Sequence, residues 1–305
     1  MKKEGIWKKL GLIFSPGQYD WMYTHAQNPL PELLPGGLIK VHFSTRDSRN
    51  RAQGAFFIFD INEPHKILDL SNKPTLSLGD LGSFDDAGVM PGSIVSSSTS
   101  KYLYYTGWSR TVDVPFAFHI GLAVTKSDHE IFSRVSRAPV LGRNFHDPFI
   151  VGAPYVLLID GSFRMWYTSC TRWAEENGKV KHYYTVKHAR SDDGIYWKCS
   201  DQLCLDYQKD EYAIARPVVW QTESGYKMWF TFRGGNDTYR IGVAESEDGI
   251  SWRRHLEPLG IDVSDTGWDS EMICYAHPIV SSGRTYALYN GNSYGKSGIG
   301  LAELV

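Results

Sequence analysis

The feature that most constrains the fold of this chain is an internal repeat. The sequence MWYT at 165–168 is followed by a β-rich run at 183–189 and by SDDGIYW at 191–197. The same order returns with MWFT at 228–231, a run at 241–246 and SEDGISW at 246–252. Period-two patterning and turn signals make each copy a short antiparallel sheet of four strands. Two such copies in succession indicate a repeat architecture.

Five copies can be aligned on a proline that opens the first strand of each: Pro29, Pro91, Pro148, Pro217 and Pro278. Second strands are expected at 39–44, 102–106, 165–168, 228–231 and 286–290. Third strands are expected at 55–60, 119–124, 183–189, 241–246 and 299–304. The sequence therefore predicts an all-β fold, a five-bladed β-propeller with four-stranded antiparallel blades.

The fifth copy has no fourth strand, because the chain stops just after its third. The missing strand is found at the other end of the chain, where residues 5–9 resemble residues 194–198 and 249–253. We expect this N-terminal strand to pair with the last blade and close the ring, since closure removes two exposed sheet edges. No linker divides the chain, so residues 1–305 are expected to form a single domain.

Charge and cysteine usage exclude several function classes. The net charge of −2 argues against nucleic acid or an anionic membrane as the main partner. No stretch approaches the length of a membrane span. The four cysteines lack metal-ligand spacing and are expected to be reduced thiols in a cytoplasmic protein, and nothing demands a metal or another cofactor. The sequence leaves the oligomeric state open.

The starts of the first strands of a propeller converge on one end of its central channel. Here the residue before each proline is Asn28, Met90, Asp147, Arg216 or His277. A polar funnel of this kind is not what core packing alone requires, because unpaired buried charges are costly. The approaches to these strands add Asp86, His146, Glu211, Glu271 and Tyr275, and the ends of second strands add Arg46, Trp108, Arg233 and Asn290.

Carboxylates beside aromatic rings suit chemistry at a glycosidic bond. One carboxylic acid protonates the leaving oxygen, and a second carboxylate activates water or stabilises the cation. Asp147 is the central catalytic candidate, with Glu271, Glu211 or Asp86 as its partner. The remaining polar and aromatic residues of the funnel are candidates for binding the substrate. Asp147 could instead cap a strand, and Arg216 could form a structural ion pair with it.

The repeat, with its Asp-Pro start, its Met-Trp-Tyr strand and its Ser-x-Asp-Gly-Ile-x-Trp turn, resembles the five-bladed propeller glycoside hydrolases of families 43, 32, 62, 68, 117 and 130. This resemblance implies that Asp147 orients the sugar and tunes a neighbouring pKa. Asn28 stands where families 43 and 32 place an aspartate, and Ala215 stands where they place the general acid. The turn sequences themselves are interpreted as structural, on the face opposite the site.

Three functions stay open at this stage. The first is a glycoside hydrolase-like enzyme acting on a small-molecule or oligosaccharide substrate. The second is a phosphorylase or glycosyltransferase, in which Arg216 and His277 would bind phosphate or an activated sugar, because a guanidinium group matches phosphate oxygens. The third is a glycan-binding propeller without catalysis, which the two missing carboxylates favour.

Overall fold

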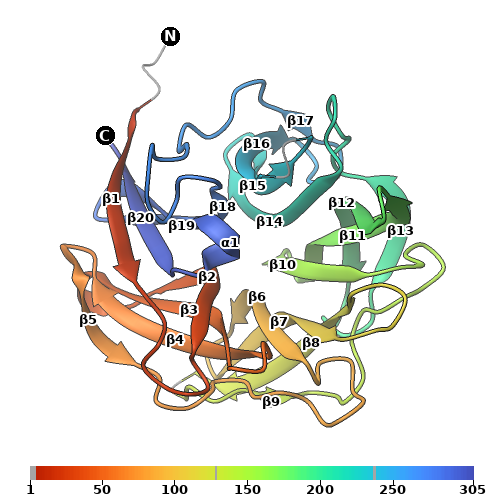
Figure 1. Cartoon of the computed structure of the whole chain (residues 1–305), viewed down its shortest axis with the longest axis horizontal. Coiled ribbons are helices and arrows are strands. Elements are labelled where there is room, and N and C mark those ends of the chain that lie inside the picture. The colour runs from red at the N-terminus through yellow and green to blue at the C-terminus, as the bar shows by residue number, and fades with distance from the viewer. Residues whose placement is uncertain (1–4, 128, 236–237) are drawn as a thin grey trace.

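The computed structural model describes residues 5–127, 129–235 and 238–305, and strands dominate it (Figure 1). Group one contains β2 (Thr24–Leu33), β3 (Leu38–Arg46), β4 (Ala52–Asp60) and β5 (Glu63–Leu70). Group two contains β6 (Gly88–Ser96), β7 (Ser100–Ser109), β8 (Ala117–Lys126) and β9 (Ser133–Arg134). Group three contains β10 (Val151–Ile159), β11 (Ser162–Glu176), β12 (Lys179–Ser191) and β13 (Lys198–Leu203).

Group four contains β14 (Ala213–Thr222), β15 (Gly225–Arg233), β16 (Arg240–Ser246) and β17 (Arg253–Arg254). Group five contains β18 (Cys274–Ser281), β19 (Arg284–Asn290), β20 (Ile299–Leu304) and β1 (Trp7–Phe14). The helical segments are short, η1 (Pro35–Gly37) and α1 (Asn292–Gly295). No helix among the described residues has the length and apolar character that crossing a membrane requires.

Every group is antiparallel, and only single residue pairs join one group to the next through a sheet. Groups one and two form one eight-stranded sheet through the parallel pair Ala52 and Gly88, and groups three and four form another through Tyr184 and Ala213. Group five is a separate four-stranded sheet. Figure 1 shows the groups arranged around a common centre, with β2, β6, β10, β14 and β18 innermost.

The N-terminal strand belongs to the last group, as the sequence predicted. β1 pairs antiparallel with β20 from Trp7 opposite Leu304 to Phe14 opposite Ile299. The expected second and third strands all lie within observed strands. The prediction was wrong for the first strand of group three, because β10 begins at Val151, after Asp147 and Pro148. The proline of group three that is equivalent to Pro217 is Pro154, which lies six residues after Pro148.

Apolar cores lie between successive groups. Leu30 and Val89 belong to a core between groups one and two, and Tyr104 and Val151 to one between groups two and three. Similar cores join groups three to four and four to five. A further core contains Phe57 of group one and Leu288 of group five, so the two ends of the chain pack together. Burial of this apolar surface is the main force that holds the groups against each other.

The two Ser-x-Asp-Gly turns also join neighbouring groups. In each, the aspartate accepts hydrogen bonds from the two residues after the glycine, which fixes the turn. The carbonyl of Gly194 then accepts from the hydroxyl of Tyr104, and that of Gly249 accepts from Nε1 of Trp166. These turns are structural elements, as expected from the sequence.

Candidate functional site

A pocket of ≈ 260 Å³ lies where the first strands begin, and each group contributes at least one residue of its first strand to the lining. Asn28, Met90, Ala153, Arg216 and Tyr275 are among these residues, one from each group. The prediction that the strand starts converge is confirmed for Asn28, Met90 and Arg216. It was wrong for Asp147 and His277, whose places in the lining are taken by Ala153 and Tyr275.

Local backbone geometry aims these side chains into the pocket. The pairing of each first strand with the second shifts by a bulge beside the lining residue. Asn28, Ala153, Arg216 and Tyr275 have φ of 56°, 46°, 53° and 56°. Positive φ is unfavourable for residues other than glycine and persists only where surrounding structure enforces it. Such strain gathers at functional sites.

The preceding group holds each strained residue in place. The hydroxyl of Thr106 accepts from the amide of Ala153 at 2.7 Å, that of Thr168 from Arg216 at 3.3 Å, and that of Thr231 from Tyr275 at 2.9 Å. The side chain of Asn290 does the same for Asn28 at 3.0 Å, across 262 residues of sequence. One bond of this kind therefore joins the last group to the first. Asn290 is fully buried and acts here as a structural residue.

Three arginines line the pocket, and the described lining contains no aspartate or glutamate. Arg46 donates to Oε1 of Gln27 at 3.0 Å and to Oδ1 of Asn50 at 2.8 Å. Arg233 donates to the hydroxyl of Tyr294 and to Nε2 of His182, both at 3.2 Å. All of these acceptors are neutral, so a carboxylate in the described lining does not compensate the positive charges of the pocket.

Arg216 is the deepest of the three arginines, with 2% of its surface exposed. Its guanidinium donates to the carbonyls of Pro91 and Gly92 at 3.2 and 2.9 Å, while Nε has no partner. Burial lowers the pKa of this side chain to about 10, which still leaves it charged at neutral pH. A buried cation held only by carbonyl dipoles is costly unless an anion joins it.

Aromatic and phenolic side chains form a second part of the lining. Tyr239 and Tyr275 have pKa values raised by burial, so both are neutral hydroxyl groups at pH 7. Tyr294 has a φ of 60° within α1, a further strained backbone position at the site. Sequence reasoning did not find Phe116 or Phe118, which lie before and within the start of β8 and also line the pocket. The repeat pattern gave only a weak signal for them, because Phe116 lies in an irregular loop.

Asp147 lies outside this lining and is fully buried. Its carboxylate accepts from the hydroxyls of Tyr167 at 2.9 Å and Ser169 at 2.6 Å, and from Nδ2 of Asn144 at 3.1 Å. Nζ of Lys187 lies 3.2 Å from Oδ1 and completes a buried ion pair. The expectation that Asp147 faces the channel mouth is therefore wrong, since four donors enclose this carboxylate within the protein.

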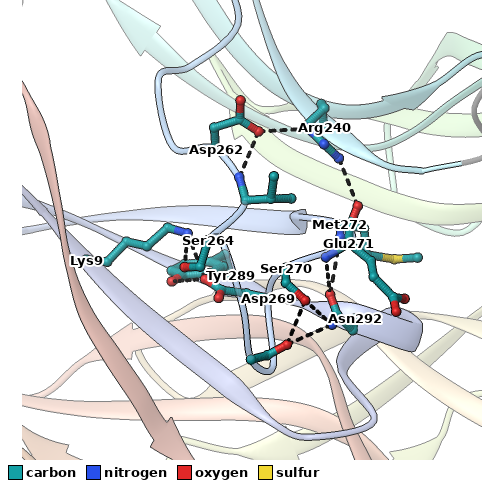
Figure 2. Close-up of polar contacts among 12 residues, drawn as sticks. Lys9, Arg240, Asp262, Ser264, Asp269, Ser270, Glu271, Met272, Tyr289 and Asn292 are labelled. Atoms are coloured by element: carbon teal, nitrogen blue, oxygen red, sulfur yellow. Dashed lines mark hydrogen bonds and ion pairs between the residues drawn. The ribbon is translucent and has the colours of Figure 1, made fainter.

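The arrangement around Asp147 occurs in two other groups. Tyr105 donates to Asp85 and Tyr289 donates to Asp269, and both tyrosines follow their aspartate by 20 residues, as Tyr167 does. Each aspartate also has a cation, Arg134 from β9 for Asp85 and Lys9 from β1 for Asp269 (Figure 2). A contact repeated at equivalent positions indicates that these carboxylates stabilise the fold.

The three other predicted carboxylates also lie outside the lining of the pocket. Glu211 forms a two-point pair with Arg254 at 2.6 and 2.9 Å, which occupies both of its oxygens. Asp86 accepts from the amide of Gly82 at 2.9 Å. Glu271 is exposed, and its backbone is held by Asn292 and Arg240 (Figure 2). The predicted convergence of two carboxylates on this pocket is not seen.

Of the three remaining predicted contact residues, one packs against a residue of the pocket and two lie elsewhere. Trp108 lies beneath Arg46, with the guanidinium 5.3 Å from the ring centroid. His146 lies 3.2 Å from the exposed Asp201. His277 lies two residues beyond Tyr275 on β18, is within 3.0 Å of its neighbour's carbonyl oxygen, and lines a different cavity that contains Trp7 and Trp220. Only Trp108 of these three supports a residue of the pocket.

Burial lowers the pKa of four histidines far below 6.5. The values are about 3 for His25 and His277 and about 4 for His182 and His188. In His182, which lines the pocket, the positive charge of Arg233 adds to the effect of burial. These imidazoles are neutral at pH 7 and do not add to the positive charge of the pocket.

Solved structures with the same fold are glycoside-active proteins. One called "Glycoside hydrolase" aligns with 97% of this chain and 90% of its own, with a TM-score of 0.77 and 16% identity. A thermostable family-43 glycoside hydrolase aligns with 95% of this chain and 91% of its own, at a TM-score of 0.66 and 16% identity. A third structure aligns with 99% of this chain and 94% of its own, with a TM-score of 0.72 and 15% identity. Its title states that the GH130 family of mannoside phosphorylases contains glycoside hydrolases that target β-1,2 mannosidic linkages in Candida mannan.

These likenesses confirm the resemblance at the level of fold: the chain has the fold of the glycoside hydrolase structures to which it is similar. No family model matches the sequence. Two Mycobacterium tuberculosis proteins, Rv1502 of strain H37Rv and MT1551 of strain CDC 1551, are each 41% identical over 300 residues, which cover 98% of this chain and 99% of theirs. Both are described as uncharacterized proteins. The chain belongs to the family of Rv1502, a family with the fold of the propeller glycoside hydrolases.

Proposed function

We propose that groups one to five are the blades of a five-bladed propeller, and that the pocket at its centre binds carbohydrate. The apolar core and the Asn290–Asn28 hydrogen bond between the last and first groups support a ring closed by β1. The glycoside-active neighbours support a carbohydrate ligand. A cytoplasmic location remains part of the proposal, and the four free cysteines are consistent with it.

The ligand of the pocket carries a negative charge. The observation that supports this most strongly is the set of three arginines, Arg46, Arg216 and Arg233, in a lining without a described carboxylate. Phosphate, sulfate and carboxylate groups all accept hydrogen bonds from guanidinium groups, and bonds between charged groups are about twice as strong as neutral ones. A sugar that carries one of these groups fits the pocket better than a neutral sugar.

Among enzymatic reactions, glycosyl transfer to or from phosphate fits this pocket better than hydrolysis. Hydrolysis of a glycosidic bond ordinarily uses two carboxylates that flank the bond. The described lining supplies none, whereas its arginines suit a phosphate group that enters or leaves. In phosphorolysis, an oxygen of hydrogen phosphate bonds to the anomeric carbon, the glycosidic C–O bond breaks, and the leaving oxygen takes up the proton that the hydrogen phosphate gives up.

A second candidate is an anionic-glycan-binding protein without catalysis. It is favoured by the same lining, which offers neutral tyrosines but no described carboxylic acid to protonate a leaving group. The two candidates share the ligand and differ only in whether a bond is broken.

Binding measurements test the shared ligand. Titration calorimetry should detect hexose 1-phosphates or hexuronates and should not detect the parent neutral hexoses. Arg216→Met should abolish this binding, whereas Arg253→Met, which removes an exposed arginine outside the pocket, should leave it unchanged. Equal binding of neutral and charged sugars, or full affinity in Arg216→Met, would refute the proposal.

Activity assays separate the candidates. Aryl glycosides incubated with and without inorganic phosphate should release the aryl alcohol only when phosphate is present. Release of the aryl alcohol that does not depend on phosphate would favour a hydrolase. Binding with no release under either condition would favour the glycan-binding protein.

A further inference from the structure

A wall of aromatic side chains rises from the pocket along the hairpin of β11 and β12. Val151, the first residue of β10, pairs with Ser169, but β11 and β12 stay paired as far as Glu176 and Lys179. The hairpin therefore extends beyond the start of β10, at the end of the sheet where Thr168 and Tyr184 line the pocket.

One face of this extension carries rings that meet the loop before β8. Trp173 lies opposite His182 in the pairing of β11 with β12, so both side chains share a face. The ring of Phe116 lies 5.6 Å from that of Trp173 and 5.5 Å from that of His182, centroid to centroid, and stacks on Phe118 at 4.4 Å. All four are only partly buried, and Phe116, Phe118 and His182 line the pocket.

The wall and the arginines lie on the same pocket, and His182 joins them. Nε2 of His182 accepts from Arg233, while the His182 ring meets Trp173 at 5.3 Å and stacks on Tyr184 at 4.8 Å. A ligand whose anion binds the arginines can therefore lay an adjoining ring against the aromatic side chains. The C–H face of a sugar ring is apolar and suits an aromatic surface, and the rings would otherwise expose apolar area to water.

We propose that the wall formed by Phe116, Phe118, Trp173 and His182 is a second subsite, which binds a sugar ring attached to the anionic group. This inference rests on the proposed function and specifies its substrate class. The preferred ligand is a saccharide in which a charged group and an unmodified ring adjoin, such as a glycosyl phosphate or an acidic disaccharide. Inorganic phosphate would occupy the arginines alone.

The test compares two probes on three proteins and one control variant by titration calorimetry. The probes are inorganic phosphate and a disaccharide 1-phosphate, and the proteins are wild type, Trp173→Ala and Trp173→Phe. We expect Trp173→Ala to weaken the disaccharide phosphate about tenfold and to leave inorganic phosphate unchanged. Trp173→Phe should restore most of the affinity, because it keeps a ring at this position. Trp197→Ala, which removes an aromatic residue outside the pocket, is the matched control.

The outcomes separate this subsite from the anion site. Unchanged disaccharide affinity in Trp173→Ala would overturn the subsite while leaving the arginine site intact. Equal losses for both probes would also overturn it, since they would show that Trp173 only shapes the arginine site. A nucleoside diphosphate that binds more tightly than the disaccharide phosphate, and loses affinity in Trp173→Ala, would show that the wall stacks a nucleobase and would refute the sugar assignment.

Discussion

Replacement of Asp147 by asparagine should destabilise the protein instead of selectively removing an activity. The side chain is fully buried, accepts three hydrogen bonds and pairs with Lys187, whose own side chain is only 6% exposed. The substituted amide could keep some of these hydrogen bonds, but it would leave the Lys187 cation buried with the carbonyl of His146 as its remaining acceptor. Breaking a buried ion pair in this way costs about 3 kcal/mol.

This cost can be converted into a melting temperature. Unfolding entropies of ~2.1 cal/mol/K per residue imply that about 3 kcal/mol lowers the Tm of a 305-residue chain by about 5 °C. Differential scanning calorimetry of Asp147→Asn measures this shift directly. The matched control is Asp192→Asn, which breaks an exposed pair with Lys198 and should leave the Tm unchanged.

The opposite result would refute the structural interpretation of Asp147. If Asp147→Asn melted with the wild type but lost turnover or ligand affinity, this aspartate would be a working residue of the site. If the variant melted lower and bound anionic sugar normally at a temperature where it is folded, the structural role would stand.

Three further predictions concern the ring and its buried polar groups. Thr231→Val removes the hydroxyl that accepts from the Tyr275 amide and should cost about 1–3 kcal/mol in urea unfolding; a loss below about 0.5 kcal/mol would contradict a supporting role. Lys9→Met should lower the Tm, because it leaves the Asp269 side chain, which is 3% exposed, without its cation. In a double-mutant cycle, Lys9→Met/Asp269→Asn should recover part of this loss, and strictly additive losses would show that the pair is not coupled. His25, His182, His188 and His277 stay neutral in the fold, whereas the unfolded chain takes up protons on these side chains below pH 6.5, so their contribution to stability should be complete above pH 6.5 and be lost as the pH falls towards about 3. His277→Gln should make the stability less dependent on pH in this range, and an unchanged slope of Tm against pH would contradict this.

Much of the fold could be predicted from the sequence because the repeat is carried by apolar strands. The second strands around Trp166 and Trp229 and the third strands that follow them have the same pattern in successive copies, and this pattern determines which face is buried. The pairing of β1 with β20 could also be predicted, because a Gly-Ile pair lies shortly before Trp7, as another does before Trp252.

The alignment of group three failed for a physical reason. Two prolines, Pro148 and Pro154, lie close together, and the one preceded by aspartate matched the expected chemistry. The correct register was visible in another signal, the tyrosine that follows Asp85, Asp147 and Asp269 by 20 residues. That spacing marks all three aspartates as equivalent and places Asp147 before its strand.

The walls of the pocket could be predicted only in part. Arg46, Arg216 and Arg233 were found because they lie at strand starts and ends, where repeat geometry determines direction. Phe116 and Trp173 were not, since one lies in an irregular loop and the other in a hairpin longer than the repeat requires. Loop conformation and hairpin length depend on tertiary packing, which a period-two pattern does not encode.

A crystal structure with a hexose 1-phosphate tests the central claim most directly. We expect the phosphate within about 2.7–2.9 Å of guanidinium nitrogens of Arg46, Arg216 or Arg233, with the unpartnered Nε of Arg216 among the candidates. A phosphate bound elsewhere on the protein, with the arginine pocket lacking ligand at saturating concentration, would contradict it.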